Sequence, residues 1–420
     1  MARSKKVVLA TLGSLGDLNP CIAIALELKS RGHDVLISSS ESYRGRVLQC
    51  GLSFHSIRPD LRIDKETIER ILRNDGAEYL VREVLLACLS YTYRDLTRAC
   101  TDADLLISGD LVLAAPLVAE KQGIPWISAV LSPSSFGSIY DFFPTLAARI
   151  GKVASRIASG IMNELARFSM RSWTPPVDAL RQEIGLARDR HPLTVGRLSS
   201  RMVLGLFSSV IDVPRSDWPA ATRVTGAIFY DRDGYPKTIS SELQTFLDQD
   251  EAPLVFTLGS SATLSPGNFY EESVKSAQIL GRRAVFLVGK NSKHLNLTAK
   301  LLASDYEPYS ALFPRAAAVI QAAGAGSIAH SLRAGCPMLL LPYGGFDQPL
   351  NAARLERRGL ARTINPREYT AEKAVSEISC LLNNPEFKDR AQQVSRIVRA
   401  ENGLQVACKL IEKEMEIENA

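Results

Sequence analysis

The residues best suited to chemistry lie between positions 318 and 351. A short apolar run that ends at Ile320 predicts a buried strand, and the turn Gly324-Ala325-Gly326-Ser327 leads into a helix predicted over residues 327–334. Small residues let the backbone of such a turn approach a ligand, and the first turn of a helix offers N–H groups and a partial positive charge. The pattern therefore predicts a phosphate-binding turn.

Polar side chains follow the next predicted strand. Gly335-Cys336-Pro337 ends the helix, residues 338–341 form a strand, and Asp347-Gln348 come after a glycine turn. Open α/β sheets bind ligands at the carboxyl ends of their strands, so we expect a carboxylate and an amide beside the phosphate-binding turn. This pairing favours a nucleotide sugar, whose hydroxyl groups need such partners, over a bare nucleotide.

The amino-terminal part of the chain carries a comparable turn. Residues 7–11 form a continuous apolar run typical of a buried parallel strand, and Gly13-Ser14-Leu15-Gly16-Asp17 follows it. Pro20 suits a first helical turn, so we expect the helix over residues 21–29. Asp17 could cap that helix, as Asp often does, or it could accept a proton in a reaction.

Strand-like and helix-like segments alternate along the chain, which indicates doubly wound parallel sheets. The predicted strands of the first half cover residues 7–11, 34–38, 105–108, 125–130 and 202–208, and those of the second half cover 223–226, 254–257, 284–288, 318–320 and 338–341. A polar, proline-containing stretch at 212–219 predicts a boundary between a domain over residues 1–215 and one over 222–394.

Composition bounds the class of protein. The chain has 420 residues, 46% of them hydrophobic, which fits two globular domains, and its net charge of +5 does not argue for nucleic-acid binding. The charge suits an anionic donor or an acidic membrane surface. Seven scattered cysteines without metal-ligand spacing predict buried thiols in a reducing compartment. No apolar run approaches the ~20 residues that span a bilayer, so we expect a cytoplasmic protein with at most peripheral membrane contact at its inner face.

The motifs of residues 321–351 resemble the donor-binding segment of family 1 glycosyltransferases. That family has His-x-Gly-Gly-Ala-Gly-Thr, Leu-x-x-Gly-x-Pro and Asp-Gln-x-x-Asn in succession, and this chain has Gln321-Ala322-Ala323-Gly324-Ala325-Gly326-Ser327, Leu332-Arg333-Ala334-Gly335-Cys336-Pro337 and Asp347-Gln348-Pro349-Leu350-Asn351. The resemblance covers nearly the whole chain. It implies the α/β fold called GT-B, in which two Rossmann-like, doubly wound parallel-sheet domains face each other across a cleft. It also implies that the first domain binds the acceptor, that the second binds the donor, and that a terminal helix over about 395–420 packs back on the first domain.

The turn Gly16-Asp17-Leu18-Asn19-Pro20 is similar to the Gly-Asp-x-x-Pro of a bacterial subgroup in which Asp replaces the catalytic His. Sterol glucosyltransferases share this pattern, and the layout also resembles the rhamnosyltransferase of rhamnolipid synthesis. The resemblance implies inverting transfer of a hexose from a UDP- or dTDP-sugar to a hydroxyl of a small lipophilic acceptor, with Asp17 as the catalytic base. The sequence has no His and Cys cluster, so we expect no metal and no cofactor besides the nucleotide-sugar co-substrate.

The resemblance also assigns the donor site. Ser260 falls where the family contacts phosphate, and Tyr306 falls where an aromatic side chain could stack on the base or simply pack. The full set of implied donor-binding residues is Ser14, Ser260, Tyr306, Gln321, Gly324, Gly326, Ser327, Asp347 and Gln348.

Gln321 leaves a second function open. It replaces the family's His, and a glutamine amide donates a hydrogen bond but carries no positive charge toward a diphosphate leaving group. The alternative is a catalytically weak nucleotide-sugar-binding relative, against which the retained Asp17 argues. A Rossmann oxidoreductase is disfavoured, because neither glycine turn matches Gly-x-Gly-x-x-Gly followed by an acidic residue.

The stretch from residue 132 to about 190 is less regular. Insertions here commonly shape the acceptor pocket in this fold, whereas the simpler interpretation is that their side chains pack in the core. The side chains in question are Phe136, Tyr140, Phe142, Phe143, Met170 and Trp173.

Overall fold

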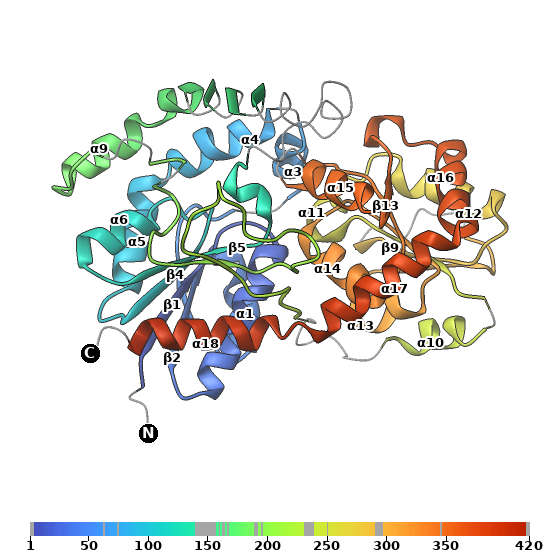
Figure 1. The fold of residues 1–420 in the computed structure, drawn as a ribbon, viewed down its shortest axis with the longest axis horizontal. Helices are drawn as coiled ribbons and strands as arrows, with labels where there is room; N and C mark the ends of the chain where they lie inside the picture. The colour runs from blue at the N-terminus through green and yellow to red at the C-terminus, as the bar shows by residue number, and fades with distance from the viewer. Residues whose placement is uncertain are drawn as a thin grey trace. The chain divides into compact units, whose positions relative to one another are not determined.

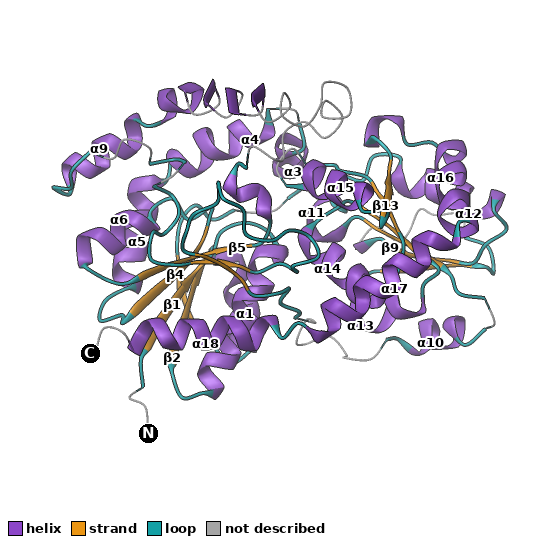
Figure 2. Ribbon diagram, in the orientation of Figure 1, coloured by secondary structure: helices purple, strands orange, loops and turns teal. Residues whose placement is uncertain are grey.

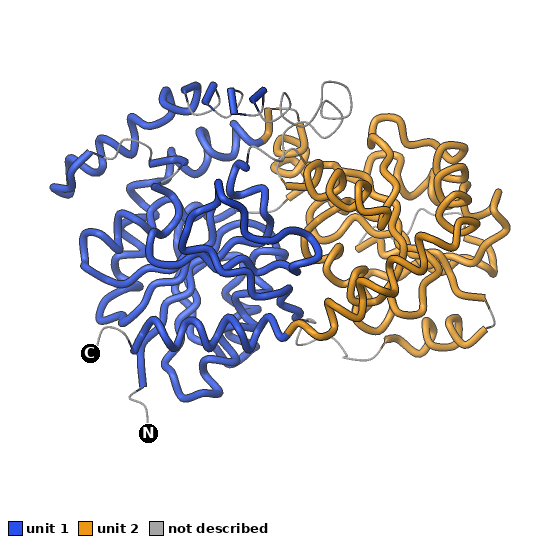
Figure 3. The backbone as a smooth tube through the Cα atoms, viewed as in Figure 1, with its two compact units in different colours: residues 1–62, 77–230, 402–420 blue, residues 63–76, 231–401 orange. Residues whose placement is uncertain are grey.

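The computed structural model describes residues 4–61, 64–73, 75–138, 157–158, 160–161, 164–165, 168–188, 192–194, 196–230, 239–249, 251–289, 297–344 and 347–416. The chain divides into two compact units (Figure 3). Unit 1 comprises residues 1–62, 77–230 and 402–420, and unit 2 comprises residues 63–76 and 231–401. In each unit the strands form a central layer with helices on both sides (Figure 2).

Unit 1 is built on a parallel sheet whose described strands are ordered β3-β2-β1-β4-β5-β6-β7. The strands are β1 (Lys6–Ala10), β2 (Asp34–Ser39), β3 (Ser53–Ser56), β4 (Leu105–Gly109), β5 (Trp126–Val130), β6 (Val203–Gly205) and β7 (Thr222–Val224). The inner strands are continuous apolar runs, because helices cover both faces of the sheet and both sets of side chains are buried. The carboxyl ends of β1, β4 and β5 therefore meet at one edge.

The helices around this sheet are α1 (Leu15–Ser30), α2 (Arg44–Gln49), α5 (Leu89–Ala99), α6 (Ala115–Gln122), α9 (Pro175–Glu183) and α18 (Gly403–Glu416), and the short α4 (Gly76–Tyr79) begins at the unit boundary. The last described helix, α18, crosses α1 in Figure 1 and is in contact with it. Its Cys408 and Ile411 are fully buried in the same cluster as Leu18 and Ile22 of α1.

The sequence predicted most inner strands of this sheet but placed two features wrongly. The first helix begins at Leu15 rather than at residue 21, so Pro20 lies in its second turn. The strand predicted at 223–226 as part of the second half is β7, which pairs in parallel with β6 in the first sheet. The edge strand β3 was not predicted, because Ser53–Ser56 contains a single apolar side chain.

Unit 2 has a parallel sheet whose described strands are ordered β10-β9-β8-β11-β12-β13. The strands are β8 (Leu254–Thr257), β9 (Ala284–Leu287), β10 (Leu301–Ser304), β11 (Ala318–Gln321), β12 (Met338–Leu340) and β13 (Ala361–Thr363). The helices are α3 (Lys65–Ile71), α10 (Ser241–Leu247), α11 (Gly259–Ala262), α12 (Phe269–Ile279), α13 (Tyr309–Leu312), α14 (Ala325–Ala334), α15 (Gln348–Arg357), α16 (Ala371–Asn383) and α17 (Pro385–Ala400). The edge strands β10 and β13 were again not predicted.

The cysteines are all free thiols. Burial raises the pKa of Cys21, Cys100, Cys336 and Cys408 to about 12. The prediction of buried thiols is wrong for the other three, because Cys50 and Cys88 are half-buried and Cys380 is exposed. Among the helices that the structure describes, none has the length and apolar character needed to cross a membrane.

Candidate active site

The turn after β1 holds the Asp17 carboxylate in place. Asp17 lies in the first turn of α1, and its Oδ2 accepts hydrogen bonds from Ser14 N at 2.7 Å and from Ser14 Oγ at 3.1 Å. The Ser14 hydroxyl oxygen accepts in turn from Gly16 N at 3.1 Å, and its contact with the backbone N–H of Asp17 completes a capping box. Asp17 therefore caps its helix, and the cap holds a half-buried carboxylate at the carboxyl end of an inner strand.

Gly13 and Tyr43 restrict this turn further. Gly13 has a φ of +126°, and a Cβ there would lie 2.5 Å from Asp17 Oδ2, so only glycine leaves room for the carboxylate. Tyr43 Oη donates a hydrogen bond to Gly13 O at 2.9 Å. Burial, helped by the nearby Asp17 charge, raises the pKa of the Tyr43 hydroxyl, which keeps it a donor at neutral pH. No local sequence pattern pointed to Tyr43, because it reaches the turn from a distant part of the chain.

Asp110 follows β4, the neighbour of β1, at the same edge of the sheet. Its Oδ2 accepts from Ser135 Oγ at 2.6 Å and lies 3.3 Å from Arg197 Nη1, and Arg197 also donates to Ser135 O. Asp110 belongs to none of the motifs described above, although it comes soon after the strand predicted over residues 105–108. Ser135 and Arg197 carried no motif, since the loop contacts that join them depend on the folded sheet.

The irregular stretch after residue 132 is partly described. Phe136 packs on Trp218 with ring centroids 4.4 Å apart, and Met170 and Trp173 pack beside a small apolar cluster with Leu86 and Leu89. These contacts are packing contacts within unit 1. Tyr140, Phe142 and Phe143 lie outside the described residues.

In unit 2 the predicted donor residues follow strands that end in line. In the strand register, Gln321 at the end of β11 pairs with Thr257 of β8 and with Leu340 of β12. Thr257 pairs in turn with Leu287 of β9. Leu287 pairs with Ser304 of β10. The register therefore brings to one edge the segments that begin after these strands and contain Ser260, Tyr306, Gly324 and Asp347.

Gln321 is fully buried at the end of β11. Its Nε2 donates to Ser331 Oγ on α14 at 2.9 Å, and its Oε1 has no hydrogen-bond partner among the residues that the structure describes. The amide therefore ties the strand to the helix that follows it. A contact between Gln321 and a donor phosphate stays a prediction.

The turn between β11 and α14 exposes backbone rather than side chains. Gly324 is the N-cap of α14 and has no side chain with which to cap it, and Gly326 is exposed. Ser327 Oγ donates to Gly324 O at 3.2 Å. Ala323 has a φ of +61°, a conformation that favours glycine, at the position where the family pattern has glycine. The first N–H groups of α14 are thus not taken by a side-chain cap.

Asn351 joins this turn to the Asp347-Gln348 turn. Its buried Nδ2 donates to Asp347 Oδ2 at 2.9 Å and to Ala323 O at 3.4 Å. Gln348 Oε1 accepts from Gly344 N at 2.9 Å, so the amide also stabilises its own turn. The sequence motif includes Asn351, but only the structure shows that its side chain links the two turns.

Ser260 and Tyr306 belong to the segments that follow β8 and β10. Ser260 is exposed in the short helix α11, directly after Gly259, whose φ is +71°. Tyr306 is half-buried, and its carbonyl oxygen accepts from Ser304 Oγ at 3.3 Å. In the part of the chain that the structure describes, no three His, Cys, Asp or Glu side chains gather as a group that could hold a metal ion.

Comparison with known families matches both halves of the chain to glycosyltransferases. The model of the family described as UDP-glucoronosyl and UDP-glucosyl transferase matches residues 157–411, and that of the glycosyltransferase family 28 N-terminal domain matches residues 7–140. The O-mycaminosyltylonolide 6-deoxyallosyltransferase of Streptomyces fradiae is 30% identical over 97% of this chain and 97% of its own. The sterol 3-beta-glucosyltransferase UGT80A2 of Arabidopsis thaliana is 25% identical over 98% of this chain and 66% of its own.

Solved glycosyltransferase structures share the fold. The calicheamicin glycosyltransferase CalG4 matches with a TM-score of 0.72 at 16% identity, over 98% of both chains. The glycosyltransferase VinC in complex with dTDP matches with a TM-score of 0.70 at 20% identity, over 97% of this chain and 98% of its own. The predicted fold class, two Rossmann-like parallel-sheet domains of the GT-B type, is confirmed.

Proposed function

We propose the following reaction for this chain, which belongs to the UDP-glucoronosyl and UDP-glucosyl transferase family. It transfers a hexose from a UDP- or dTDP-sugar to a hydroxyl of a small lipophilic acceptor, with inversion at the anomeric carbon and without a metal. The observation that carries this proposal is the Asp17 carboxylate, fixed by Ser14 at the carboxyl end of β1. These hydrogen bonds orient the carboxylate, and a positioned carboxylate can act as a general base.

Asp17 accepts the proton of the acceptor hydroxyl as the acceptor oxygen attacks the anomeric carbon. The bond from that carbon to the diphosphate oxygen breaks, and the leaving nucleoside diphosphate takes the electron pair. A single displacement with the base on the face opposite the leaving group inverts the anomeric centre. No covalent enzyme intermediate is required.

The donor side uses the aligned strand ends of unit 2. Backbone N–H groups of Gly324 and Gly326, with the Ser327 hydroxyl, stabilise the charge that develops on the diphosphate, as the first turn of α14 favours anions. Asp347 and Gln348 hold sugar hydroxyls. Tyr306 stacks on the nucleobase of the donor, and Ser260 contacts its phosphate. Ser14 of the first domain also contacts the donor. Gln321 supports the turn through Ser331 instead of supplying charge.

The nature of the substrates is supported by relatives. The Streptomyces fradiae relative is named as a transferase of a deoxysugar to a mycaminosylated tylonolide, the Arabidopsis relative as a sterol glucosyltransferase, and VinC was solved with dTDP. We accordingly propose a UDP or dTDP donor and a lipophilic natural product or sterol-like alcohol as acceptor. Free cysteines accord with a cytoplasmic enzyme.

The test is turnover of UDP- and dTDP-hexoses with a panel of lipophilic alcohols, with and without EDTA. We expect product whose anomeric configuration is opposite to that of the donor, at a rate that EDTA does not change. Product with retained configuration would contradict the single displacement, and loss of activity in EDTA that is restored by a divalent cation would contradict metal independence.

The second candidate function is nucleotide-sugar binding with little turnover. It is favoured by Gln321, a fully buried neutral side chain that bonds to Ser331 where the family has a phosphate-contacting His. Thermal shifts with UDP and dTDP decide between the two when measured beside turnover. At 100 times its dissociation constant a ligand stabilises by about 2.7 kcal/mol. A clear shift without product from any acceptor would favour the binding protein.

A further inference from the structure

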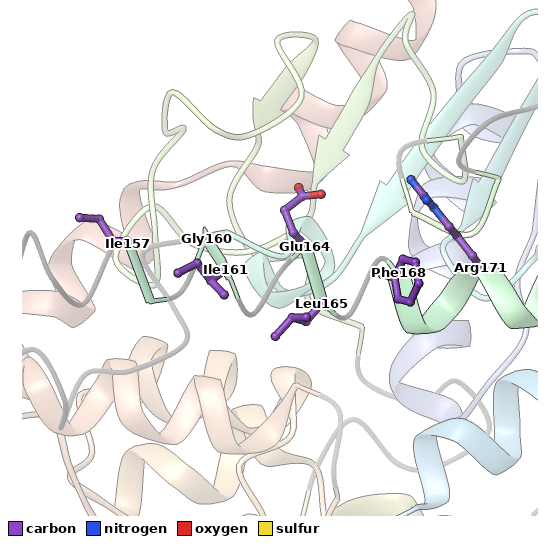
Figure 4. Close-up of a pocket in the computed structure, with 7 residues that line it drawn as sticks. All are labelled: Ile157, Gly160, Ile161, Glu164, Leu165, Phe168 and Arg171. Carbon is purple, nitrogen blue, oxygen red and sulfur yellow. The ribbon is translucent and has the colours of Figure 1, made fainter.

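The segment after β10 in unit 2 holds a charged side chain that is almost completely buried. Glu307 is 3% exposed and follows Tyr306, which the proposed function places on the nucleobase of the donor. The hollow shown in Figure 4 differs, because it is lined mostly by exposed side chains such as Ile161 and Phe168 of unit 1. Burying a charge is costly unless hydrogen bonds compensate it, so the partners of Glu307 show what it holds in place.

Three donors compensate the Glu307 carboxylate. Its Oε1 accepts from Ser240 Oγ at 2.6 Å and from Ser304 Oγ at 3.2 Å, and its Oε2 accepts from Ser240 N at 3.1 Å. Ser304 is the last residue of β10, and Ser240 is the N-cap of α10. The carboxylate therefore links the end of a strand to the start of a helix that is distant in the sequence.

Both ends of this link belong to well-packed elements. Helix α10 lies in the core, since its Leu243 and Phe246 are buried in the same cluster as Leu287 of β9. Ser304 is held in the sheet, where its carbonyl oxygen accepts from Val288 N at 3.0 Å. Glu307 thus fastens the segment between β10 and α13 to rigid parts of unit 2.

The backbone of Glu307 does not take part in a hydrogen-bonded ladder. Within the part of the chain that the structure describes, its N–H and C=O groups make no hydrogen bond. Pro308, which follows, has no N–H to donate. Tyr306 O accepts from Ser304 Oγ at 3.3 Å, and this is the same hydroxyl that contacts the carboxylate. The conformation of the segment therefore depends on the Glu307 side chain.

We propose that Glu307 is a positioning residue for the nucleobase of the donor. Its carboxylate holds residues 306–308 in the conformation in which Tyr306 stacks on the base. This inference rests on the proposed function, because it requires a UDP- or dTDP-sugar as donor. A segment that is held in place before the ligand arrives loses less conformational freedom on binding, so the link raises nucleotide affinity without touching the nucleotide.

The test is calorimetric titration of the full chain with UDP, dTDP and inorganic pyrophosphate, which has no base. Glu307→Ala should raise the dissociation constant of the nucleotide that the parent binds more tightly by about tenfold, because the segment is no longer held in advance. The dissociation constant of pyrophosphate should change by less than about twofold, since the turn after β11 is unaltered. Glu307→Gln should weaken nucleotide binding less, because its amide oxygen can still accept from Ser240 Oγ.

Glu272→Ala is the matched control. Glu272 is also a carboxylate of unit 2 that accepts from the first backbone N–H of a helix, Ala371 N at 2.8 Å, and from a second donor, Lys275 Nζ at 2.6 Å. It joins α12 to α16, which contacts β12 and β13, whereas β10 is the strand at the opposite edge of the sheet. The control should lower the melting temperature but bind the nucleotide and pyrophosphate like the parent chain.

Three results would overturn the inference. One is an equal loss of nucleotide affinity in Glu307→Ala and Glu272→Ala, which would mean that both act through the stability of unit 2. Another is an equal loss of nucleotide and pyrophosphate affinity in Glu307→Ala, which would place the effect on the diphosphate. The third is an unchanged nucleotide affinity in Glu307→Ala. If that variant does not fold, Glu307→Gln is compared with Glu272→Gln in the same way. A parent chain that binds neither UDP nor dTDP would instead overturn the proposed function.

Discussion

The turn after β1 in unit 1 and the turn after β11 in unit 2 both lead from a buried parallel strand into a helix, but they use their polar groups differently. In the first turn the Ser14 and Asp17 side chains cap the helix, and the carboxylate is held by two hydrogen bonds. In the second turn Gly324 offers no side-chain cap, and an exposed Gly326 leaves the backbone of α14 approachable. The first turn fixes a side chain, whereas the second leaves backbone N–H groups for a ligand.

This contrast separates the expected effects of substitutions. Changes in the first turn should act on the rate of the chemical step, because they alter or displace the carboxylate. Changes in the second turn should act on donor affinity, because they alter access to the backbone.

Asp17→Asn should have the largest effect. The amide oxygen can still accept the cap hydrogen bond from Ser14 N, so the melting temperature should change little, but the amide cannot take a proton. We expect kcat to fall by about 10²–10⁴-fold at unchanged donor KM. Ser14→Ala is the companion variant, since it removes hydroxyl hydrogen bonds and leaves the carboxylate. If Asp17→Asn keeps more than about a tenth of the parent kcat, Asp17 is a cap and not a base.

Gly13→Ala should have the next largest effect. Its Cβ would meet Asp17 Oδ2 at 2.5 Å and its φ of +126° is unfavourable for alanine, so the carboxylate must move. A displacement of about 1 Å lowers the rate by about 10²-fold. Steady-state kinetics should be compared with Gly32→Ala, which has a φ of +95° but open space around its Cβ. Equal kinetics for the two variants would mean that backbone strain alone matters and that the placing of Asp17 does not.

Asn351→Ala should affect the second turn through its support. It removes hydrogen bonds to Asp347 Oδ2 and Ala323 O from a buried side chain, which should destabilise unit 2 by about 1–3 kcal/mol. Donor KM should rise by about tenfold while kcat changes less. Asn365→Ala, which removes a hydrogen bond to Arg367 N in the same unit, serves as the control in both chemical denaturation and kinetics. A donor KM that rises equally in both variants would show that the link Asn351 makes between the two turns does not support donor binding.

Gly326→Ala should have the smallest effect, with a slightly more stable protein and weaker donor binding. A Cβ here meets nothing within 4 Å, and alanine favours a helix over glycine by about 0.5–1 kcal/mol, so the melting temperature should rise slightly. If a diphosphate approaches this backbone closely, the added methyl group should raise donor KM several-fold. Both quantities are measured on one preparation, and a raised melting temperature with unchanged donor KM would place the diphosphate elsewhere.

The sequence predicted those parts of the molecule that local chemistry determines. Buried inner strands such as β1 and β8 appear as apolar runs, and the order of the donor motifs indicated the fold. The edge strands β3 and β13 were missed, because each carries a single apolar side chain. The edge strand β10 was also missed, although Leu301, Leu302 and Ala303 form a short apolar run. The start of α1 was missed because Pro20 was expected in the first helical turn, whereas the Ser14 capping box starts the helix at Leu15.

The site shows the same division. Asp17, Gly324 and Asp347 stand in motifs and were named in advance as site residues, and their catalytic and binding roles stay predictions. Tyr43 and Arg197 were not, because each reaches a strand end from a segment distant in the sequence. The burial of Gln321 against Ser331 also escaped prediction, since the direction of a side chain at a strand end depends on the helix packed above it.

The position of α18 has a consequence for how the protein is made. Its Ala407, Cys408, Ile411 and Met415 complete the apolar cluster around α1, yet they are synthesised only after residues 231–401 of unit 2. Domains generally fold as units as they emerge during translation, with the amino-terminal one first. Here the core around α1 can close only after residues 231–401 of unit 2 have been translated, so the newly made α1 presents a bare apolar face until α18 emerges.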